Sequence, residues 1–310
     1  MLRNTVLALL IAAEATHGQA AFTLRKTYDS SNFLDSFNFR DRAYFDSIDP
    51  GYEGDPTAAL LKPGGSRHGR GSVRLESKES YSSGILIADI EHMPGTACGV
   101  WPAYWSYNFD EDPVGEIDII EGINGNQNGN YVSLHTCGAC IFNRPGGADP
   151  RNNCNIGGSD TRYCTDANQH SSGCGNTMPS GSYGKTFNAN KGGVYATWLT
   201  TEAVKVWWFP RNNIPADIKN GKPEPNTWGQ PATSQFVNAN GNCDVGRYFK
   251  KQTILQIFNT AFCGSNIDQG IWNQECRAST GYATCDDYVT NQPGAFKEAY
   301  WTINSLKLYQ

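Results

Sequence analysis

Several signatures of common protein classes are missing from this 310-residue sequence. It has no GxSxG nucleophile elbow, HExxH zinc motif, phosphate-binding P-loop or GxGxxG dinucleotide fingerprint. Basic residues are fewer than acidic ones, so the formal net charge is −5, and no Lys or Arg occurs between Glu79 and Asn143. These absences argue against serine hydrolases, zinc proteases, nucleotide-dependent enzymes and proteins that bind nucleic acid.

Long apolar runs are also absent, apart from one at the N-terminus. A positive start (1–4) precedes an apolar run (5–13), and small residues follow at Gly18-Gln19-Ala20. This order is typical of a secretory signal peptide, since nine residues are too few to cross a bilayer as a helix. We therefore predict a signal peptide over residues 1–20 and a secreted, extracellular protein over residues 21–310, with no membrane partner.

Cysteine, in contrast, is plentiful. An even number of cysteines in a secreted chain predicts up to five disulfides, whose pairing the sequence leaves open. The ten cysteines are Cys98, Cys137, Cys140, Cys154, Cys164, Cys174, Cys243, Cys263, Cys276 and Cys285. The pair Cys137-Gly-Ala-Cys140 could instead be a redox site or half of a zinc site. No second CxxC follows and the five histidines are scattered, so we expect structural disulfides and no metal.

Short alternating segments recur along the chain between turns rich in Gly and Asn. They cover residues 71–77, 131–136, 192–209, 253–262 and 299–310, the third being two strands around a Thr200-Thr201-Glu202 turn. Many short strands of this kind predict an all-β sandwich. Residues 137–190 contain few apolar side chains, and we interpret them as a long loop held by disulfides. Nothing in the sequence requires a second domain, so residues 21–310 are predicted to form a single one.

Three acids separated only by isoleucines crowd into the segment GEIDIIEG (115–122). In a regular strand, Glu116 and Asp118 point to one face and Glu121 to the other. A β-bulge within the Ile-Ile pair adds one residue and returns Glu121 to the face of Glu116. We therefore predict a bulged strand with the isoleucines facing the core and three acids on the opposite face.

Neighbouring carboxylates repel each other, and this repulsion raises the pKa of at least one of them, as a general acid requires. Two carboxyl groups about 5 Å apart are the arrangement of retaining glycoside hydrolases. The alternative is an exposed acidic strand, or one paired with distant Lys and Arg side chains.

Aromatic residues flank the acids. The segment WPAYW lies just upstream and places Trp101 and Trp105 at helix or loop spacing near the acids, and the strand KVWWFP contains Trp207 and Trp208. Aromatic rings stack on the C–H faces of sugars, but most tryptophans in a domain of this kind belong to the core. Because Trp207 and Trp208 are adjacent in a strand, at most one of them can line a cleft. His135 is either a structural residue or a hydrogen-bond partner of a substrate.

With these residues in place, the sequence resembles glycoside hydrolase family 16, in particular the secreted fungal endo-β-1,3(4)-glucanases, or laminarinases. The ExDxxE signature is Glu116-Ile-Asp118-Ile-Ile-Glu121. The other shared blocks are YDSSNF (28–33), SVRLESK (72–78), HMPGTACGVWPAYW (92–105), LHT (134–136), NANKGGVYATW (188–198), KVWWFPRNNIPADI (205–218), FNTAFCG (258–264) and AYWTINSLKLYQ (299–310).

The resemblance implies a concanavalin A-like β-jelly-roll sandwich whose concave sheet forms a glycan-binding cleft. It implies retaining endo-hydrolysis of β-1,3 or mixed β-1,3/1,4 glucans, with Glu116 as nucleophile and Glu121 as acid/base. Asp118 would hold Glu116 by a shared hydrogen bond. It further implies substrate contacts from Trp101, Trp105, His135 and Asn259, and neither a cofactor nor a catalytic metal.

Two alternatives share this fold. A cell-wall glucan transglycosylase would use the same acids but transfer the glycosyl group to a sugar. A non-catalytic glycan-binding lectin would not require both outer glutamates, and both are present. The chain departs from relatives after Trp105 and after the FCG block, where stacking tryptophans often occur, so its preferred glucan could differ. The expected partner is a β-glucan polysaccharide, and we expect a monomer.

Overall fold

The computed structural model describes most of the chain that follows the predicted signal peptide. The described residues are 21–40, 72–108, 115–125, 129–136, 174–233, 236–237, 243–249 and 256–310, together with the backbone of 141–143, 153–155 and 254–255. The predicted signal peptide and the CxxC segment lie outside these ranges. Within them, no helix is both long and apolar enough to cross a membrane.

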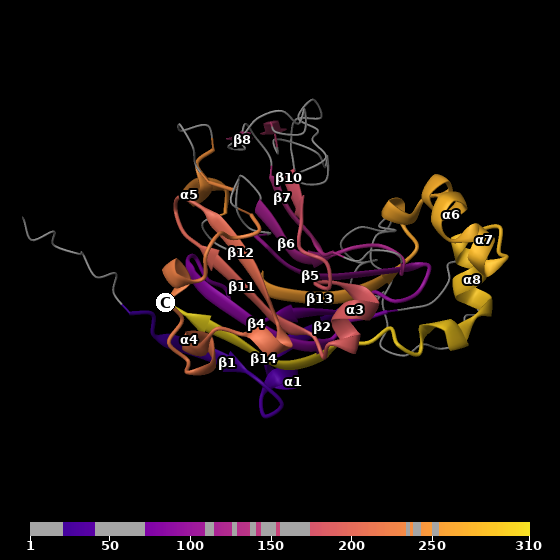
Figure 1. Cartoon of the computed structure of the whole chain (residues 1–310). Coiled ribbons are helices and arrows are strands. Elements are labelled where there is room, and N and C mark those ends of the chain that lie inside the picture. The colour runs from indigo at the N-terminus through magenta and orange to yellow at the C-terminus, as the bar shows by residue number, and fades with distance from the viewer. Residues whose placement is uncertain are drawn as a thin grey trace, which may run out of the picture.

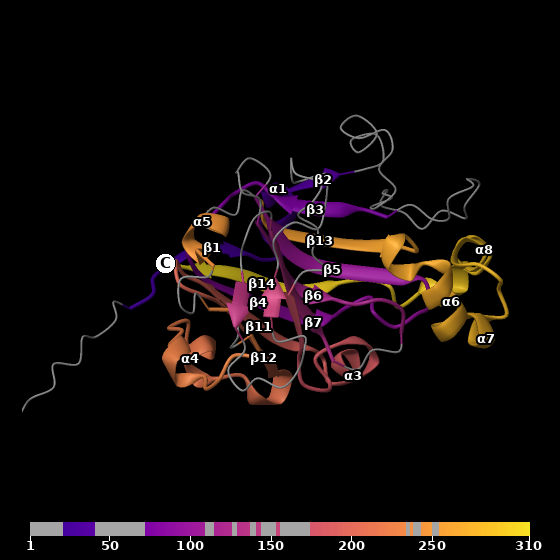
Figure 2. The ribbon, with the colours of Figure 1, turned by 90° about the horizontal axis from the view of Figure 1, so that it is seen from above.

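Two antiparallel sheets are packed face to face (Figures 1 and 2). The five-stranded sheet has the order β1 (Leu24–Tyr28), β14 (Thr302–Tyr309), β4 (Gly84–His92), β11 (Gly193–Leu199) and β12 (Val204–Pro210). The seven-stranded sheet has the order β10 (Cys174–Thr177), β7 (Tyr131–Thr136), β6 (Gly115–Glu121), β5 (Val100–Tyr107), β13 (Ile254–Phe262), β3 (Arg74–Ser77) and β2 (Phe37–Arg40). Strands β8 (Ile141–Asn143) and β9 (Asn153–Asn155) pair separately. The predicted all-β sandwich is confirmed.

The main core lies between the two sheets, because alternate side chains of each strand point inward. Tyr104 and Phe258 stack there with ring centroids 4.4 Å apart. Trp301 meets Phe258 edge to face at 5.3 Å. The three isoleucines of β6 are fully buried in the same cluster, so β6 is held from its inner side.

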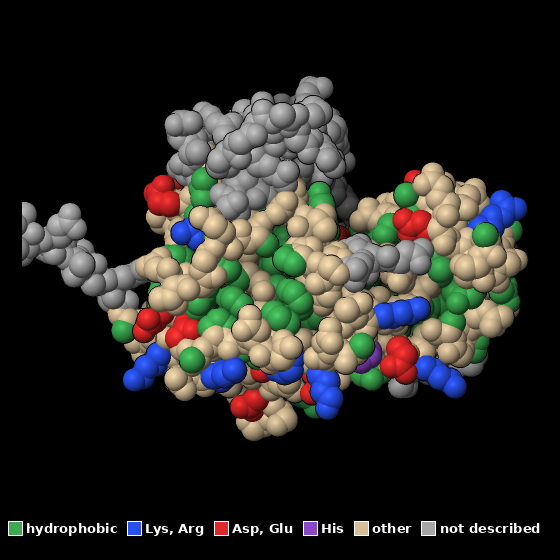
Figure 3. Space-filling model, in the orientation of Figure 1, with side chains coloured by type: hydrophobic (Ala, Val, Ile, Leu, Met, Phe, Trp, Pro, Cys, Tyr) green, Lys and Arg blue, Asp and Glu red, His purple; other side chains and the backbone are tan. Residues whose placement is uncertain are grey.

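The tryptophan pair of β12 faces both ways, as its adjacency predicts. Trp207 is buried in a second apolar cluster on the outer face of the five-stranded sheet, where it meets Trp228 edge to face at 5.2 Å. Trp208 packs against the main core instead. Around β11 and β12, hydrophobic atoms are visible in the middle of the face shown in Figure 3, whereas charged side chains lie mainly along its lower edge.

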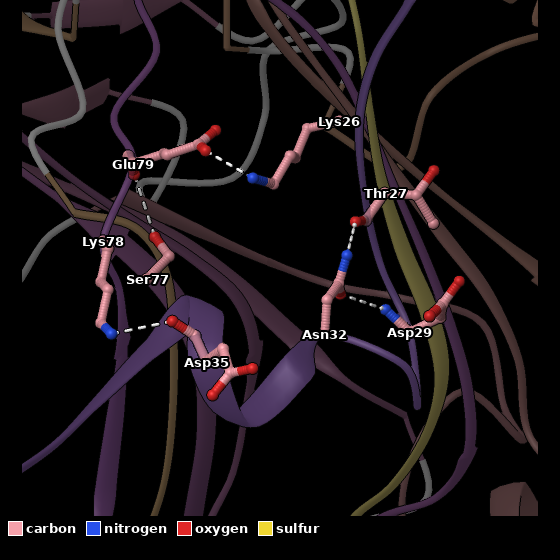
Figure 4. Close-up of polar contacts among 8 residues, drawn as sticks. All are labelled: Lys26, Thr27, Asp29, Asn32, Asp35, Ser77, Lys78 and Glu79. Carbon is pink, nitrogen blue, oxygen red and sulfur yellow. Dashed lines mark hydrogen bonds and ion pairs between the residues drawn. The ribbon is translucent and has the colours of Figure 1, made fainter.

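The N-terminal segment ties the two sheets together, because the chain passes from β1 to β2 through the short helix α1 (Phe33–Ser36). Figure 4 shows its polar contacts with the end of β3. Lys78 Nζ donates a hydrogen bond to the backbone carbonyl of Asp35 at 2.8 Å, and Lys26 forms an ion pair with Glu79. The amide of Asn32 closes the intervening turn through two backbone hydrogen bonds.

A group of short helices lies beyond the ends of β5 and β13 (Figures 1 and 2). It consists of α6 (Gln269–Glu275), α7 (Arg277–Thr280) and α8 (Cys285–Asn291), with η5 (Ser265–Ile267) and η6 (Pro293–Phe296) at its ends. We call it the helical cap. Its small core surrounds the fully buried Trp272, and two disulfides, Cys98–Cys276 and Cys263–Cys285, fasten it. Cys174 and Cys243 are also disulfide-bonded, so every described cysteine is paired.

The other helices in the described residues are short and lie in connections. They are α3 (Gly184–Ala189), α4 (Ala216–Lys219), α5 (Val245–Tyr248), η2 (Arg211–Asn213) and η3 (Pro225–Thr227). The interpretation of residues 137–190 as one long loop is therefore wrong in its described parts, since β10 extends the seven-stranded sheet and α3 follows it. The sequence of β10, Cys-Gly-Asn-Thr, has no apolar alternation because it is a short edge strand.

Candidate active site

The acids of β6 share one face because the strand contains a bulge. On the β5 side, Trp105 pairs with Asp118 and Tyr104 with Ile120, so Ile119 is an extra residue. On the β7 side, the register also shifts by one residue between Asp118 and Glu121. The predicted bulge is confirmed. Since the isoleucines fill the core, the three acids lie on the outer face of the seven-stranded sheet.

Asp118 is the most enclosed of the three acids, with 4% of its surface exposed. Ser133 Oγ donates a hydrogen bond to its Oδ2 at 2.9 Å, and His135 Nε2 lies 3.4 Å from the same oxygen. Burial raises the pKa of Asp118 well above its ordinary value, and the charges of Glu116 and Glu121 raise it further. Asp118 therefore favours its protonated form.

Glu121 has a different environment. Trp101 Nε1 donates a hydrogen bond to its Oε1 at 3.1 Å. Burial raises the pKa of Glu121, while the proximity of His135 and the Trp101 hydrogen bond oppose that increase. A carboxyl group whose pKa lies above its ordinary value is suited to donate a proton in mildly acidic solution.

Glu116, Asp118 and His135 form a compact group whose candidate ligand atoms all lie within 4.8 Å of one another. Such a trio has the spacing of a divalent cation site. Metal ligands must be deprotonated, so a cation at this group would have to displace the proton that burial and the neighbouring carboxylates favour on Asp118.

Trp105 is held from two directions beside the acids. Its Nε1 donates a hydrogen bond to Asn259 Oδ1 at 2.7 Å, and the guanidinium of Arg74 lies 4.5 Å from the centre of its ring. Glu76 lies between two cations, with Arg74 Nε at 2.9 Å and Arg40 Nε at 2.7 Å. This network fixes the plane of the indole ring.

The structure thus brings the predicted site residues together on one face. The helix or loop expected around Trp101 and Trp105 is wrong, because both residues lie in strand β5, which pairs with β6. Trp101 contacts Glu121, His135 contacts Asp118, and Trp105 with Asn259 lies on the β13 side of the acids. Their contacts with a substrate remain predictions. Sequence reasoning missed Ser133, Arg74 and Glu76, although alternation in SVRLES and YVSLHT does place these polar residues opposite the apolar ones.

Comparisons with known proteins identify relatives over most of this chain. A family model described as the XgeA-like, catalytic GH16 domain matches residues 13–309. The endo-1,3(4)-beta-glucanase of Arthroderma benhamiae is 37% identical over 324 residues, which cover 97% of this chain and 68% of the relative. A probable endo-1,3(4)-beta-glucanase of Aspergillus clavatus is 38% identical over 315 residues, which cover 94% of this chain and 46% of the relative. The chain therefore spans about half the length of the latter protein.

Solved structures are similar over almost the whole chain. An elongating GH family 16 beta-1,3-glucosyltransferase aligns with a TM-score of 0.71 and 34% identity, covering 93% of this chain and all of that one. The GH16 laminarinase 16A of Phanerochaete chrysosporium, with 6-O-glucosyl-laminaritriose in both donor and acceptor sites, aligns with a TM-score of 0.68 and 32% identity. That alignment covers 94% of this chain and 100% of the other.

Proposed function

The chain belongs to glycoside hydrolase family 16, and from this premise we propose that it is an endo-acting, retaining hydrolase of β-1,3 or mixed β-1,3/1,4 glucans. The observation that carries the proposal is the bulged strand β6, which aligns Glu116, Asp118 and Glu121 on one face. Relatives and structural neighbours with glucanase and laminarinase names support the same substrate class.

The proposed reaction has two steps. In the first, a carboxylate oxygen of Glu116 attacks the anomeric carbon, the glycosidic C–O bond breaks, and the leaving oxygen takes the proton of Glu121. In the second, Glu121 accepts a proton from water, the water oxygen bonds to the anomeric carbon, and the bond to Glu116 breaks. The raised pKa of Glu121 supports its role as acid. Asp118 would donate a hydrogen bond to Glu116 while Ser133 and His135 hold it in place.

The surrounding side chains suggest how a glucan would bind. Trp101 and Trp105 offer ring faces to sugars, while His135 and Asn259 offer hydrogen bonds, in a cleft along the outer face of the seven-stranded sheet. We further propose that residues 1–20 direct secretion and that the mature protein is a monomer. The disulfides support an extracellular location.

Transglycosylation is the second candidate, and one observation favours it: a GH family 16 glucosyltransferase has a similar fold over 93% of this chain. A sugar hydroxyl would then replace water in the second step. The same residues would serve both reactions, so the balance between them depends on how well an acceptor sugar excludes water. Binding without catalysis, as in a lectin, is a third outcome that the test below would reveal.

The test is a product time course on laminarin and on mixed-linkage β-glucan with the wild type and Glu116→Gln. We expect oligosaccharides of intermediate size from the wild type and a loss of at least roughly 10³-fold in the variant, because the nucleophile is gone. Glu202→Gln, in the exposed β11–β12 turn, is the matched control. Near-normal activity in Glu116→Gln would refute the assigned nucleophile. Longer rather than shorter products would favour transglycosylation, and binding without turnover would favour the lectin.

A further inference from the structure

The bulge that aligns the acids is bridged by a side chain outside the ExDxxE signature. Asn130 precedes β7 and is fully buried. Its Nδ2 donates a hydrogen bond to the backbone carbonyl of Ile119 at 2.6 Å, and its Oδ1 accepts one from the backbone N–H of Glu121 at 3.0 Å. One amide group therefore bonds to the backbone on both sides of the bulge.

A bulge interrupts the hydrogen-bond ladder and leaves backbone groups without strand partners. Buried backbone groups left unpaired cost about 1–3 kcal/mol each. The amide of Asn130 offers one donor and one acceptor to one carbonyl and one N–H, so it matches the need of the bulge. Without this support the carbonyl of Ile119 and the N–H of Glu121 would lose these partners, and the backbone that carries the Glu121 carboxyl would be held less firmly.

Asn130 is itself anchored by the segment that follows β10. Its backbone N–H donates to Ser182 Oγ at 2.8 Å, and Ser182 Oγ donates to the carbonyl of Pro179 at 2.6 Å. The backbone N–H of Met178 donates to the carbonyl of Asn130 at 2.7 Å. The amide is thus fixed in place before it meets the bulge.

Given the proposed function, on which this inference rests, we propose that Asn130 is a positioning residue for the acid/base Glu121. Its side chain holds the bulge that turns the Glu121 carboxyl toward the glycosidic oxygen. It does not touch the substrate. Its loss should therefore impair proton transfer more than glucan binding.

The test compares Asn130→Ala with Asn188→Ala. Asn188 is a matched control because its amide also bonds to a backbone N–H and carbonyl, those of Met93, at 2.9 Å each, and lies away from the acids. On laminarin we expect kcat to fall roughly 100-fold in Asn130→Ala with KM changed less than about threefold, since a general acid contributes about 10²–10⁴-fold. Asn188→Ala should change kcat by less than about threefold.

A second readout separates misplaced acid/base chemistry from a loss of folded protein. A dinitrophenyl β-laminaribioside needs no proton for its leaving group. Azide needs no base when it attacks the glycosyl-enzyme: it bonds to the anomeric carbon and the Glu116 carboxylate leaves. Relative to the wild type, we expect Asn130→Ala to retain more activity on this substrate than on laminarin. We also expect azide to accelerate the reaction of this variant, with formation of a β-glycosyl azide. Neither effect should occur in Asn188→Ala.

Asn130→Asp provides an independent variant of nearly the same size. Its carboxylate accepts from Glu121 N–H but repels the Ile119 carbonyl, whereas the protonated form donates to that carbonyl. We expect the kcat of Asn130→Asp relative to wild type to rise as pH falls. A kcat for Asn130→Ala like that of Asn188→Ala, without azide acceleration, or a pH-independent ratio for Asn130→Asp, would overturn the inference. Absence of activity in the wild type on both substrates would instead overturn the proposed function.

Discussion

Trp101 and Glu121 form a hydrogen bond whose effect on the acid opposes that of burial. The indole N–H stabilises the carboxylate, while desolvation favours the protonated form. Burial has the larger effect, so the pKa of Glu121 remains raised. The same hydrogen bond ends on Oε1 and so helps to orient the carboxyl group. Trp101 therefore influences both the pKa and the orientation of the Glu121 carboxyl group.

Trp101→Phe should shift the pH dependence of the proposed hydrolysis. Without the indole donor the pKa of Glu121 rises further, so the acid stays protonated to higher pH. We expect the alkaline limb of the kcat/KM profile on laminarin to move to higher pH, even if the maximum falls. Trp105→Phe is the control, because the indole N–H of Trp105 bonds to Asn259 and not to Glu121. The alkaline limb of the kcat/KM profile of Trp105→Phe should not move. An alkaline limb that is unmoved or lowered in Trp101→Phe would contradict the assignment of Glu121 as acid.

The common face of the three acids could be predicted as a hypothesis, because a bulge at the Ile-Ile pair keeps the isoleucines in the core and returns Glu121 to the face of Glu116. The partners of those acids were harder to predict. Asn130 and Ser133 are polar residues in or beside an ordinary strand, and their role depends on which strand pairs with β6. Arg74 and Glu76 alternate with apolar residues, a pattern that does not reveal that both are almost fully buried, with Arg74 against Trp105 and Glu76 paired to Arg74.

The helical cap is the element that sequence patterns did not reveal. Its helices span only four to seven residues each, which is too short for a clear 3.6-residue period. Its order comes from tertiary packing around Trp272 and from the two disulfides. Strands β11 and β14, in contrast, lie in segments that were predicted as strands. The nine-residue strand β4 was not predicted, because most of its residues are buried and its sequence, GILIADIEH, does not alternate.

Removing the cap disulfides one at a time should destabilise the protein unequally. Cys263 and Cys285 are 22 residues apart, whereas Cys98 and Cys276 are 178 residues apart. The chain-entropy model assigns about 3 kcal/mol to the shorter loop and about 5 kcal/mol to the longer one. Urea unfolding of the two double-alanine variants without reductant would measure both losses. A larger loss from the shorter loop would show that native packing, rather than loop length, governs their contribution.

The whole molecule is acidic, with a formal net charge of −5, and three of its acids, Glu116, Asp118 and Glu121, lie close together on the outer face of the seven-stranded sheet. On the face shown in Figure 3, charges of both signs are interspersed along the lower edge. A neutral polysaccharide is not affected by such a field, whereas an anionic one is repelled at long range.

Salt should therefore discriminate between substrates. We expect the KM for neutral laminarin to change less than about twofold between about 0.05 and 0.5 M NaCl, because screening acts only on charged partners. The KM for carboxymethylated laminarin should start higher and fall as salt is added. Initial rates across a salt series would provide both values. A KM for neutral laminarin that rises steeply with salt would indicate that charge contributes to glucan binding after all.

The bulge in β6 also has a consequence for how the sequence can evolve. Deleting the codon of one isoleucine would change Glu-x-Asp-x-x-Glu into Glu-x-Asp-x-Glu, and simple alternation would still keep all three acids on one face. With the extra residue gone, the Asn130 amide would have no bulge to bridge. Asn130 lies nine positions beyond Glu121 in the chain. We nevertheless expect Asn130 and the inserted isoleucine to be gained or lost together during evolution.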